Sequence, residues 1–496
     1  MNKAGISNES KIVWLICLAA ALHVFIFSAT FPFFNVVDEA EHFDLVVKYS
    51  RGDIPRTEEK LSADTCDYIA FYQSWEYLVP PQWFTNGEYP PPPWTPPAGT
   101  ARTSLDIARA GWEKQENYEV SQTPLYYVIC GSWWRVGRWL GFEGGRWLYT
   151  LRFLNILFVA FMIWLGYHTT RTIFPQNSFV QLGVPAVIAV MPQAAFYSIG
   201  NDVLSPVCFG ATFLCLVKWQ SAERPSASHG AVTGLALAAT YLAKATNIPL
   251  LAVVAFAVMV KTWRSFRNDK WPAVLPCVAF VLCAIAPILG WMIWCKTHFG
   301  DFTGAKMKME YFGWTIKPFT EWWHHPIFTP RGFWIYLSGQ IGTFWQGEFW
   351  WHHRPLSLPS SNSIYATFSL ALTAFTLWSI FARPSLPASR SPALQLSLAC
   401  FAAGLGFFAL MSIVYDFHNC PYPSRQHPYF TSGRLLLGAL IPFLILIIYG
   451  LDRALDRFGT MAKCAALAIM VSFMVAGEIA TDWSIFSNPY NWYHLP

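Results

Sequence analysis

A short acidic cluster, Asp38-Glu39-Ala40-Glu41-His42, directly follows the first apolar segment of the chain. At helical spacing, Asp38, Glu41 and His42 occupy positions i, i+3 and i+4 and therefore share one face. Two carboxyls and an imidazole that converge in this way could act as a general base or bind a cation. An amphipathic surface helix with solvated acids has the same pattern, so both interpretations stand at this point.

The composition is that of a membrane protein. Of the 496 residues, 54% are hydrophobic, 17% are aromatic and only 13% are charged, whereas a soluble domain has about 25% charged residues. Much of the surface should therefore face the lipid bilayer and its interfaces. The net charge of +5 does not indicate nucleic-acid binding. The sequence has no Walker-type loop, dinucleotide fingerprint or zinc-finger spacing.

A spanning helix needs about 20 mainly apolar residues. Such runs predict an all-α integral membrane protein with about eleven transmembrane helices. The first run is too long for a signal peptide and lacks a small-residue cleavage motif, which favours a signal anchor. The predicted spans are 12–33, 150–170, 180–199, 203–219, 229–246, 248–263, 272–295, 362–382, 394–415, 433–451 and 461–480.

The basic residues of the short connections predict the orientation, because such residues are enriched on the cytoplasmic side. With a cytoplasmic N-terminus, the short outside turns hold only Arg425, with Arg434 at a helix mouth. The C-terminus is then outside. The inside segments carry Lys3, Lys11, Arg171, Lys218, Arg224, Lys261, Arg264, Arg267, Lys270, Arg383, Arg390, Arg453, Arg457 and Lys463.

This orientation divides the chain into five parts and places large loops and interfacial helices outside the cytoplasm. The segment 125–141 is apolar but interrupted by Arg135 and Arg138. Counting it as a span would invert every later helix, so we predict an interfacial helix. The parts are the N-terminus with helix one (1–33), a first extracytoplasmic loop (34–149), helices two to seven (150–295), a second loop (296–361), and helices eight to eleven with the C-terminus (362–496).

The acidic pair after the first span, followed by His42-Phe43 and the turn Gly52-Asp53-Ile54-Pro55, resembles the opening of the GT-C glycosyltransferases. Within that superfamily it is most similar to a bacterial family of predicted membrane proteins of unassigned function. The resemblance is strongest over residues 30–260, and nothing in 296–361 contributes to it. Departures are Thr123 for a proline and Leu435 for a tyrosine. The other matching elements are Thr123–Tyr127, Arg152–Asn155, Met191–Gln193 with Asn201-Asp202, Gly234–Ala236 with Lys244, and Ser432–Arg434.

The resemblance implies a GT-C-like helix arrangement and transfer of a sugar from a polyprenyl-phosphate donor to an extracytoplasmic glycan, lipid or protein. The protein would lie in a bacterial inner membrane, with its active site facing the periplasm or cell exterior. Such a transfer needs a base for the acceptor proton and positive charge for the departing phosphate. Asp38 is the predicted base, with Glu39 as second choice.

Asp202, at the outer end of helix three, could meet Asp38, and the two could hold a divalent cation such as Mg or Mn. Asn201-Asp202 is equally typical of a helix N-cap. Lys244 could extend to the interface or contact the lipid phosphate, and Arg434 could clamp a phosphate bidentately. The predicted substrate-binding residues are His42, Tyr126, Lys244 and Arg434.

The remaining polar residues of the outside loops give weaker indications. The adjacent pairs His324-His325 and His352-His353 lie among tryptophans, and adjacent side chains on a helix do not face one site, so interfacial packing is predicted. Glu348 is a candidate for contact with the acceptor or a metal. Cys66 and Cys420 are the outside cysteines; their compartment allows a disulfide, but the sequence does not determine pairing.

A polytopic transporter or flippase for a lipid-linked or envelope-related substrate is the alternative. Transporters typically have inverted halves, with broken or charged helices near the middle of the membrane. Here the conspicuous acids lie on one side, beside a long loop. This placement favours the enzyme.

Overall fold

The chain is almost entirely helical in this computed structural model, which describes residues 8–76, 79–95, 101–268, 274–352, 354–356, 359–382 and 390–496. The prediction of an all-α membrane protein is confirmed. The longer helices are α1 (Asn8–Thr30), α6 (Gly144–Ile173), α7 (Ser178–Ala189), α8 (Leu204–Ser221), α9 (Ala227–Ala243), α10 (Ile248–Asn268), α11 (Val274–Phe299), α14 (Pro330–Gln346), α15 (Pro359–Ala382), α16 (Arg390–Val414), α17 (Leu440–Ala454) and α18 (Gly459–Asp482).

Nine helical segments in the described residues are long and apolar enough to cross a membrane. Two of the eleven predicted spans are shorter, because α7 has 12 residues and α9 has 17. The helix α7 ends before Met191-Pro192, since a proline disfavours the helical conformation of the residue before it. The predicted span 180–199 is therefore half helix and half irregular chain.

The irregular chain after α7 is buried in protein, which satisfies its polar backbone groups. Asn155 Nδ2 donates to the carbonyl oxygens of Phe196 and Ser198 at 3.2 and 2.8 Å. The Ile199 N–H donates to Glu39 Oε1 at 2.9 Å. Non-helical backbone within a membrane protein requires such internal partners. The segment leads to the short 3-10 turns η3 (Ala194–Phe196) and η4 (Asn201–Val203).

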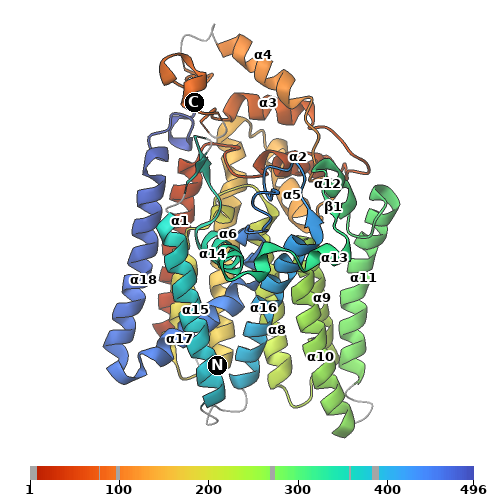
Figure 1. The fold of residues 1–496 in the computed structure, drawn as a ribbon, viewed down its shortest axis with the longest axis vertical. Helices are drawn as coiled ribbons and strands as arrows, with labels where there is room; N and C mark the ends of the chain where they lie inside the picture. The colour runs from red at the N-terminus through yellow and green to blue at the C-terminus, as the bar shows by residue number, and fades with distance from the viewer. Residues whose placement is uncertain are drawn as a thin grey trace.

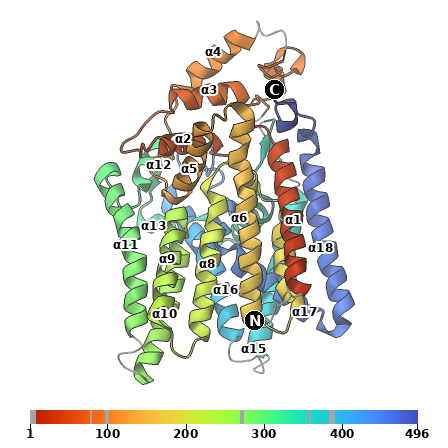
Figure 2. The same cartoon turned by 180° about the vertical axis from the view of Figure 1, so that it is seen from behind.

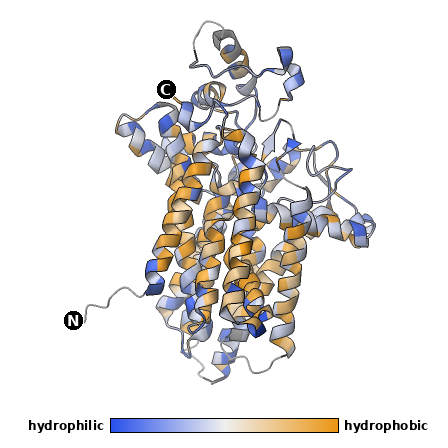
Figure 3. Ribbon diagram, turned by 90° about the vertical axis from the view of Figure 1, so that its left-hand side faces the viewer, coloured by the Kyte–Doolittle hydropathy of each residue, from blue (hydrophilic) through white to orange (hydrophobic). Residues whose placement is uncertain are grey.

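The segments between the other long helices gather with α14 at one end of the bundle, which we call the cap (the described residues of 31–143, 300–358, 415–432 and 483–496) (Figure 1). The helical bundle below the cap is mostly apolar (Figure 3). The cap contains α2 (Glu39–Ser50), α3 (Ala63–Tyr72), α4 (Ala101–Trp112), α5 (Leu125–Trp139), α12 (Ala305–Tyr311), α13 (Phe319–Trp322) and the antiparallel pairs β1 (Thr315–Ile316) with β4 (Tyr415–Asp416) and β2 (Trp350–Trp351) with β3 (Arg354–Pro355).

Basic residues mark the bundle end opposite the cap. The helices α6, α8, α10 and α17 each carry a basic residue in their last turn, and each runs away from the cap (Figure 1). This is the alternation that the sequence predicts. The side of the membrane on which this end lies remains a prediction. Lys3, Lys270 and Arg383 lie outside the described residues.

The segment predicted as an interfacial helix is α5, and it does not cross the bundle. With 15 residues it is about 22 Å long, too short to span. It packs in the cap against α2 (Figure 2). Tyr126, Cys130 and Trp134 are buried there, whereas Trp139 is 83% exposed.

The loop cysteines and the described histidines of the two pairs make contacts within the protein. Cys66 and Cys420 are both free and buried, so the disulfide that the compartment would allow is not formed. His325 Nδ1 accepts from the Ile327 N–H at 3.1 Å. His352 pairs with Glu76 at 3.0 Å. His353 lies outside the described residues.

Candidate functional site

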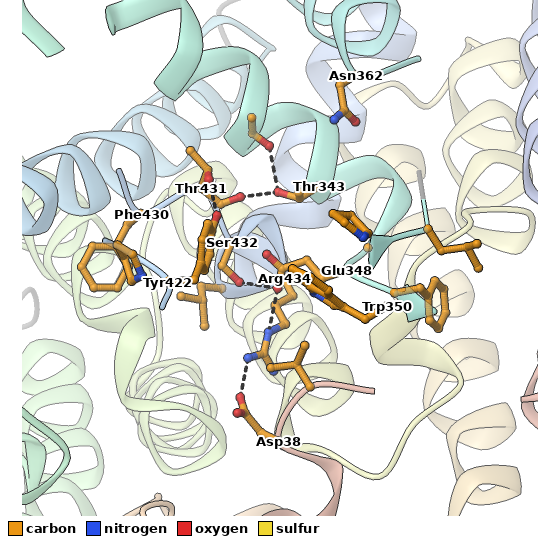
Figure 4. Close-up of a pocket in the computed structure, with 18 of the residues that line it drawn as sticks. Asp38, Thr343, Glu348, Trp350, Asn362, Tyr422, Phe430, Thr431, Ser432 and Arg434 are labelled. Atoms are coloured by element: carbon orange, nitrogen blue, oxygen red, sulfur yellow. Dashed lines mark hydrogen bonds and ion pairs between the residues drawn. The ribbon is translucent and has the colours of Figure 1, made fainter. Parts of the chain in front are cut away.

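A cavity of ≈390 Å³ lies inside the cap, directly above the bundle, and we call it the Asp38 cavity (Figure 4). Elements far apart in the chain form it: the start of α2, α12, α14, the β2–β3 hairpin, the loop before residue 432 and the 3-10 turn η8 (Gly433–Ala439). Its polar lining includes Asp38, Lys308, Thr343, Glu348, Ser432 and Arg434. Its aromatic lining includes Phe312, Trp314, Phe349, Trp350, Tyr422 and Phe430.

Asp38 occupies the N-cap position of α2 in a left-handed conformation, with φ +65°. Asp tolerates this region better than most residues, yet such conformations cost about 1–3 kcal/mol and concentrate at functional sites. The side chain makes no capping bond to the helix. Instead its carboxylate accepts from the Tyr118 hydroxyl at 2.7 Å and from Arg434. The backbone thus turns this carboxylate away from α2 and into the cavity.

The predicted shared face of Asp38, Glu41 and His42 is wrong, because Asp38 is not within the helix. Glu41 accepts from Gln115 Nε2 at 2.9 Å. His42 Nδ1 lies 2.6 Å from the Tyr127 hydroxyl. Both side chains are buried and neither lines the Asp38 cavity. His42 therefore does not reach the Asp38 cavity.

Glu39, the second candidate base, forms a buried ion pair with Arg152. The two carboxylate oxygens accept from Arg152 Nε and Nη2 at 2.7 and 2.6 Å, and both side chains are fully buried. Glu39 also accepts from the N–H groups of Phe34 and Ile199, each at 2.9 Å. Both Glu39 carboxylate oxygens therefore already accept hydrogen bonds from the protein. Glu39 fixes the position of the chain next to Asp38.

Arg434 is the centre of the polar site. Its guanidinium binds three carboxylates: Asp38 through Nη2, Asp202 through Nη1 at 3.2 Å and Glu348 through Nε at 3.2 Å. Its side chain is 15% exposed. Bonds between a guanidinium and carboxylates are among the stronger protein hydrogen bonds. Arg434 therefore joins the start of α2, the turn η4 and the segment between α14 and β2 at one point.

Two glycines permit this arrangement. A side chain at Gly433 would collide with the backbone nitrogen of Phe344, so η8 can approach α14 closely only with glycine there. Gly347 has φ +74° and lies against the backbone of Ala194. Glycine adopts such conformations without the steric penalty of other residues. The two glycines thus let the backbone segments next to Arg434 and Glu348 pack closely against α14 and Ala194.

Lys308 brings a second positive charge to the cavity from α12. Its ammonium group pairs with Glu119, whose side chain is 1% exposed. A second contact holds α12 nearby, since Ser121 Oγ donates to the Gly304 carbonyl oxygen at 2.9 Å. Sequence reasoning missed Lys308, because a lysine in a short amphipathic helix normally faces solvent.

The cavity carboxyls have different proton affinities. Burial alone would raise the pKa of Asp38, but the charges of Arg434 and Lys308 outweigh it and hold this pKa well below its usual range. Burial raises the pKa of Glu348, although Arg434 opposes the rise. Burial and the charge of Asp38 raise the pKa of Glu41 to about 8. Asp38 is therefore ionised at neutral pH.

Lys244 and Asp202 pair with each other. Lys244 is 4% exposed and its ammonium group contacts Asp202, so it neither reaches the interface nor lines the cavity. Asp202 is not a helix cap, since the caps at the start of η4 and α8 make no side-chain bond. Tyr126 is also buried, and its hydroxyl accepts from the Gly200 N–H at 3.0 Å.

A divalent cation between Asp38 and Asp202 does not fit the residues present. The Arg434 guanidinium bridges the two carboxylates, and Lys244 neutralises Asp202 from the other side. Within the described ranges, no three His, Cys, Asp or Glu side chains gather in a way that could hold a metal. The positive charge of this site comes from protein side chains.

No curated protein matches the sequence. Among solved structures, the fold is similar to the archaeal oligosaccharyltransferase AglB from Archaeoglobus fulgidus, determined in complex with an inhibitory peptide and a dolichol-phosphate. The identity is 11% and the TM-score is 0.40. The match covers 96% of this chain but 56% of that one, so this chain spans little more than half the length of the archaeal enzyme. At this score the likeness carries no conclusion about chemistry.

A family match covers most of the chain. Residues 22–415 match the family described as "Predicted membrane protein (DUF2142)". This range includes the cap residues that line the cavity up to Leu356 and Asp202 with Lys244, whereas Arg434 lies beyond it. The chain therefore belongs to the DUF2142 family of predicted membrane proteins.

Proposed function

We propose that the chain is a membrane glycosyltransferase that moves a sugar from a polyprenyl-phosphate donor to an extracytoplasmic glycan, lipid or protein. The protein would lie in a bacterial inner membrane with the cap facing the periplasm or cell exterior. The basic residues at the opposite bundle end support this orientation. The GT-C resemblance of the sequence supports the reaction class.

One observation carries the proposal: an ionised carboxylate and two cationic side chains share a cavity with aromatic walls. Asp38, Lys308 and Arg434 line it together with residues such as Trp314 and Tyr422. Glycosyl transfer needs a proton acceptor for the incoming hydroxyl and positive charge at the departing phosphate. Aromatic side chains offer flat apolar surfaces with polar edges, which suit the face of a sugar ring.

The charges suggest an order of events. A donor phosphate bound by Arg434 and Lys308 would share the positive charge that now holds Asp38 ionised. The pKa of Asp38 would then rise, making it a better base. Asp38 would take the proton of the acceptor hydroxyl, whose oxygen forms a bond to the anomeric carbon. The bond from that carbon to the phosphate oxygen breaks, and the polyprenyl phosphate leaves with its electron pair, held by Arg434 and Lys308.

The test is sugar transfer by the full chain in proteoliposomes. Polyprenyl-phosphate donors with different labelled sugars are supplied with cell-envelope extract as acceptor. Wild type should transfer label from one donor, and Asp38→Asn should lower the rate by about 10²–10⁴-fold. Asp53→Asn, which changes an exposed cap acid, is the matched control. Activity that persists in Asp38→Asn would refute the assignment of the base.

The transporter alternative has one observation in its favour. Glu478 and Asp482 are buried ionisable residues in α18, and such residues in spanning helices often mark ion or substrate pathways. Absence of transfer with every donor, together with uptake of a lipid-linked substrate into the vesicles, would favour this alternative.

A further inference from the structure

A second, smaller cavity lies beside the Asp38 cavity, between α15 and α18. It has a volume of ≈100 Å³ and shares the lining residues Phe349 and Leu356 with its neighbour. Its polar lining includes Glu478 and Asp482, which stand one turn apart on α18. The proposed sugar transfer uses neither carboxylate.

Glu478 is well satisfied by the protein. Its Oε1 accepts from the Tyr197 hydroxyl at 2.5 Å, and its Oε2 lies 2.6 Å from His23 Nε2. The side chains of His23 and Glu478 are 12% and 2% exposed. This cluster links α18 to α1 and to the irregular chain after α7.

Asp482 is not satisfied. It is only 2% exposed and lines the small cavity, yet within the described part of the chain no hydrogen bond or ion pair reaches its carboxylate. Glu478, the neighbouring acid at position i−4, offers it no positive charge. A buried polar group without a partner is unfavourable, and a buried acid at such a place in a spanning helix indicates a functional partner.

We infer that the small cavity binds one compact cation, either an inorganic monovalent ion or the ammonium group of an organic ligand. A water molecule takes about 30 Å³ in the liquid, so the cavity holds an ion with one or two waters but no sugar ring. The oxygens of Asp482, Glu478 and Thr481 are ligands that hard cations prefer. The described residues offer no three-residue metal cluster, which favours a single positive charge over a divalent ion.

The small cavity is connected to the Asp38 cavity by a pair of amides. Gln346, which lines the small cavity, donates through Nε2 to Asn362 Oδ1 at 2.6 Å. Asn362 lines the Asp38 cavity. A cation bound in the small cavity would therefore be separated from the Asp38 cavity by the hydrogen-bonded pair Gln346 and Asn362.

The test measures thermal stability of the full chain in detergent micelles by tryptophan fluorescence. The salts are NaCl, KCl and methylammonium chloride, each compared at equal ionic strength with N-methyl-D-glucamine chloride, whose cation is too large to enter. A ligand that binds only the folded state raises the midpoint in a saturable way. Wild type should gain roughly 2 °C or more in at least one small cation.

Asp482→Asn and Asp482→Leu should abolish this gain, because they remove the carboxyl group that would bind the cation. Asp53→Asn should keep the wild-type response. A gain with NaCl or KCl identifies an inorganic ion, and a gain with methylammonium alone identifies an organic ammonium group. Equal midpoints in all four salts, or an unchanged response in both Asp482 variants, would overturn the inference.

Discussion

The two long cap regions contribute to the Asp38 cavity in different ways. The region 31–143 supplies two lining residues, Val37 and Asp38, and holds the buried acids Glu39 and Glu119 in ion pairs. The region 300–358 supplies most of the walls, including Trp314 and Glu348. The first region thus fixes the position of one carboxylate, and the second shapes the space around it.

The largest effect should come from breaking the support of the first region. Glu39→Leu leaves the Arg152 guanidinium buried without its counter-charge. We expect a loss of about 3–5 kcal/mol in the free energy of unfolding, measured in detergent by denaturant titration. Glu58→Leu, at an exposed position of the same region, should cost less than about 0.5 kcal/mol. Equal losses would mean that the pair does not hold the region.

An intermediate effect should come from the second region. Lys308→Gln removes a cation that lines the cavity, whereas Lys306→Gln changes an exposed lysine two residues away. Since a charge-assisted bond to phosphate contributes about 1.5–3 kcal/mol, Lys308→Gln should raise the KM for the donor roughly tenfold or more. Lys306→Gln should leave it unchanged. Equal KM values for both variants would show that Lys308 does not bind the donor.

A third effect, spread over several pH units, concerns the pH dependence of stability in the first region. The pKa of Glu41 is raised to about 8 in the folded protein, against about 4.3 for a free glutamate. The folded state therefore holds this proton more tightly, and the stability it provides is lost as pH rises from about 4.5 through about 8. The thermal midpoint should fall over this range, and Glu41→Gln should flatten the fall. Glu310→Gln, exposed on α12, should retain the wild-type slope.

Much of the fold could be predicted from sequence, because long apolar runs and basic connections are strong signals. Prediction failed at the segment 180–199. There Pro192 ends the helix, and side chains from distant elements satisfy the freed backbone. Hydropathy averages over such a break and cannot detect partners such as Asn155.

The site could be predicted only in part. Asp38 and Arg434 were identifiable because each charge stands beside a span. Lys244 stands in the sequence where an interfacial lysine would, whereas the turns at 201–203 and 245–247 bring it against Asp202. Lys308 and the aromatic walls come from short elements that only the tertiary fold places together.

The central claim is that Asp38 performs chemistry and does not merely hold Arg434. Asp202 provides the comparison, since it also binds Arg434 but does not line the cavity. The decisive measurement is the transfer rate at saturating labelled donor for Asp38→Asn and Asp202→Asn, with donor KM determined in parallel. We predict a loss of at least about 100-fold in kcat for Asp38→Asn, and for Asp202→Asn a change mainly in KM. Equal losses of kcat in both variants would contradict the claim.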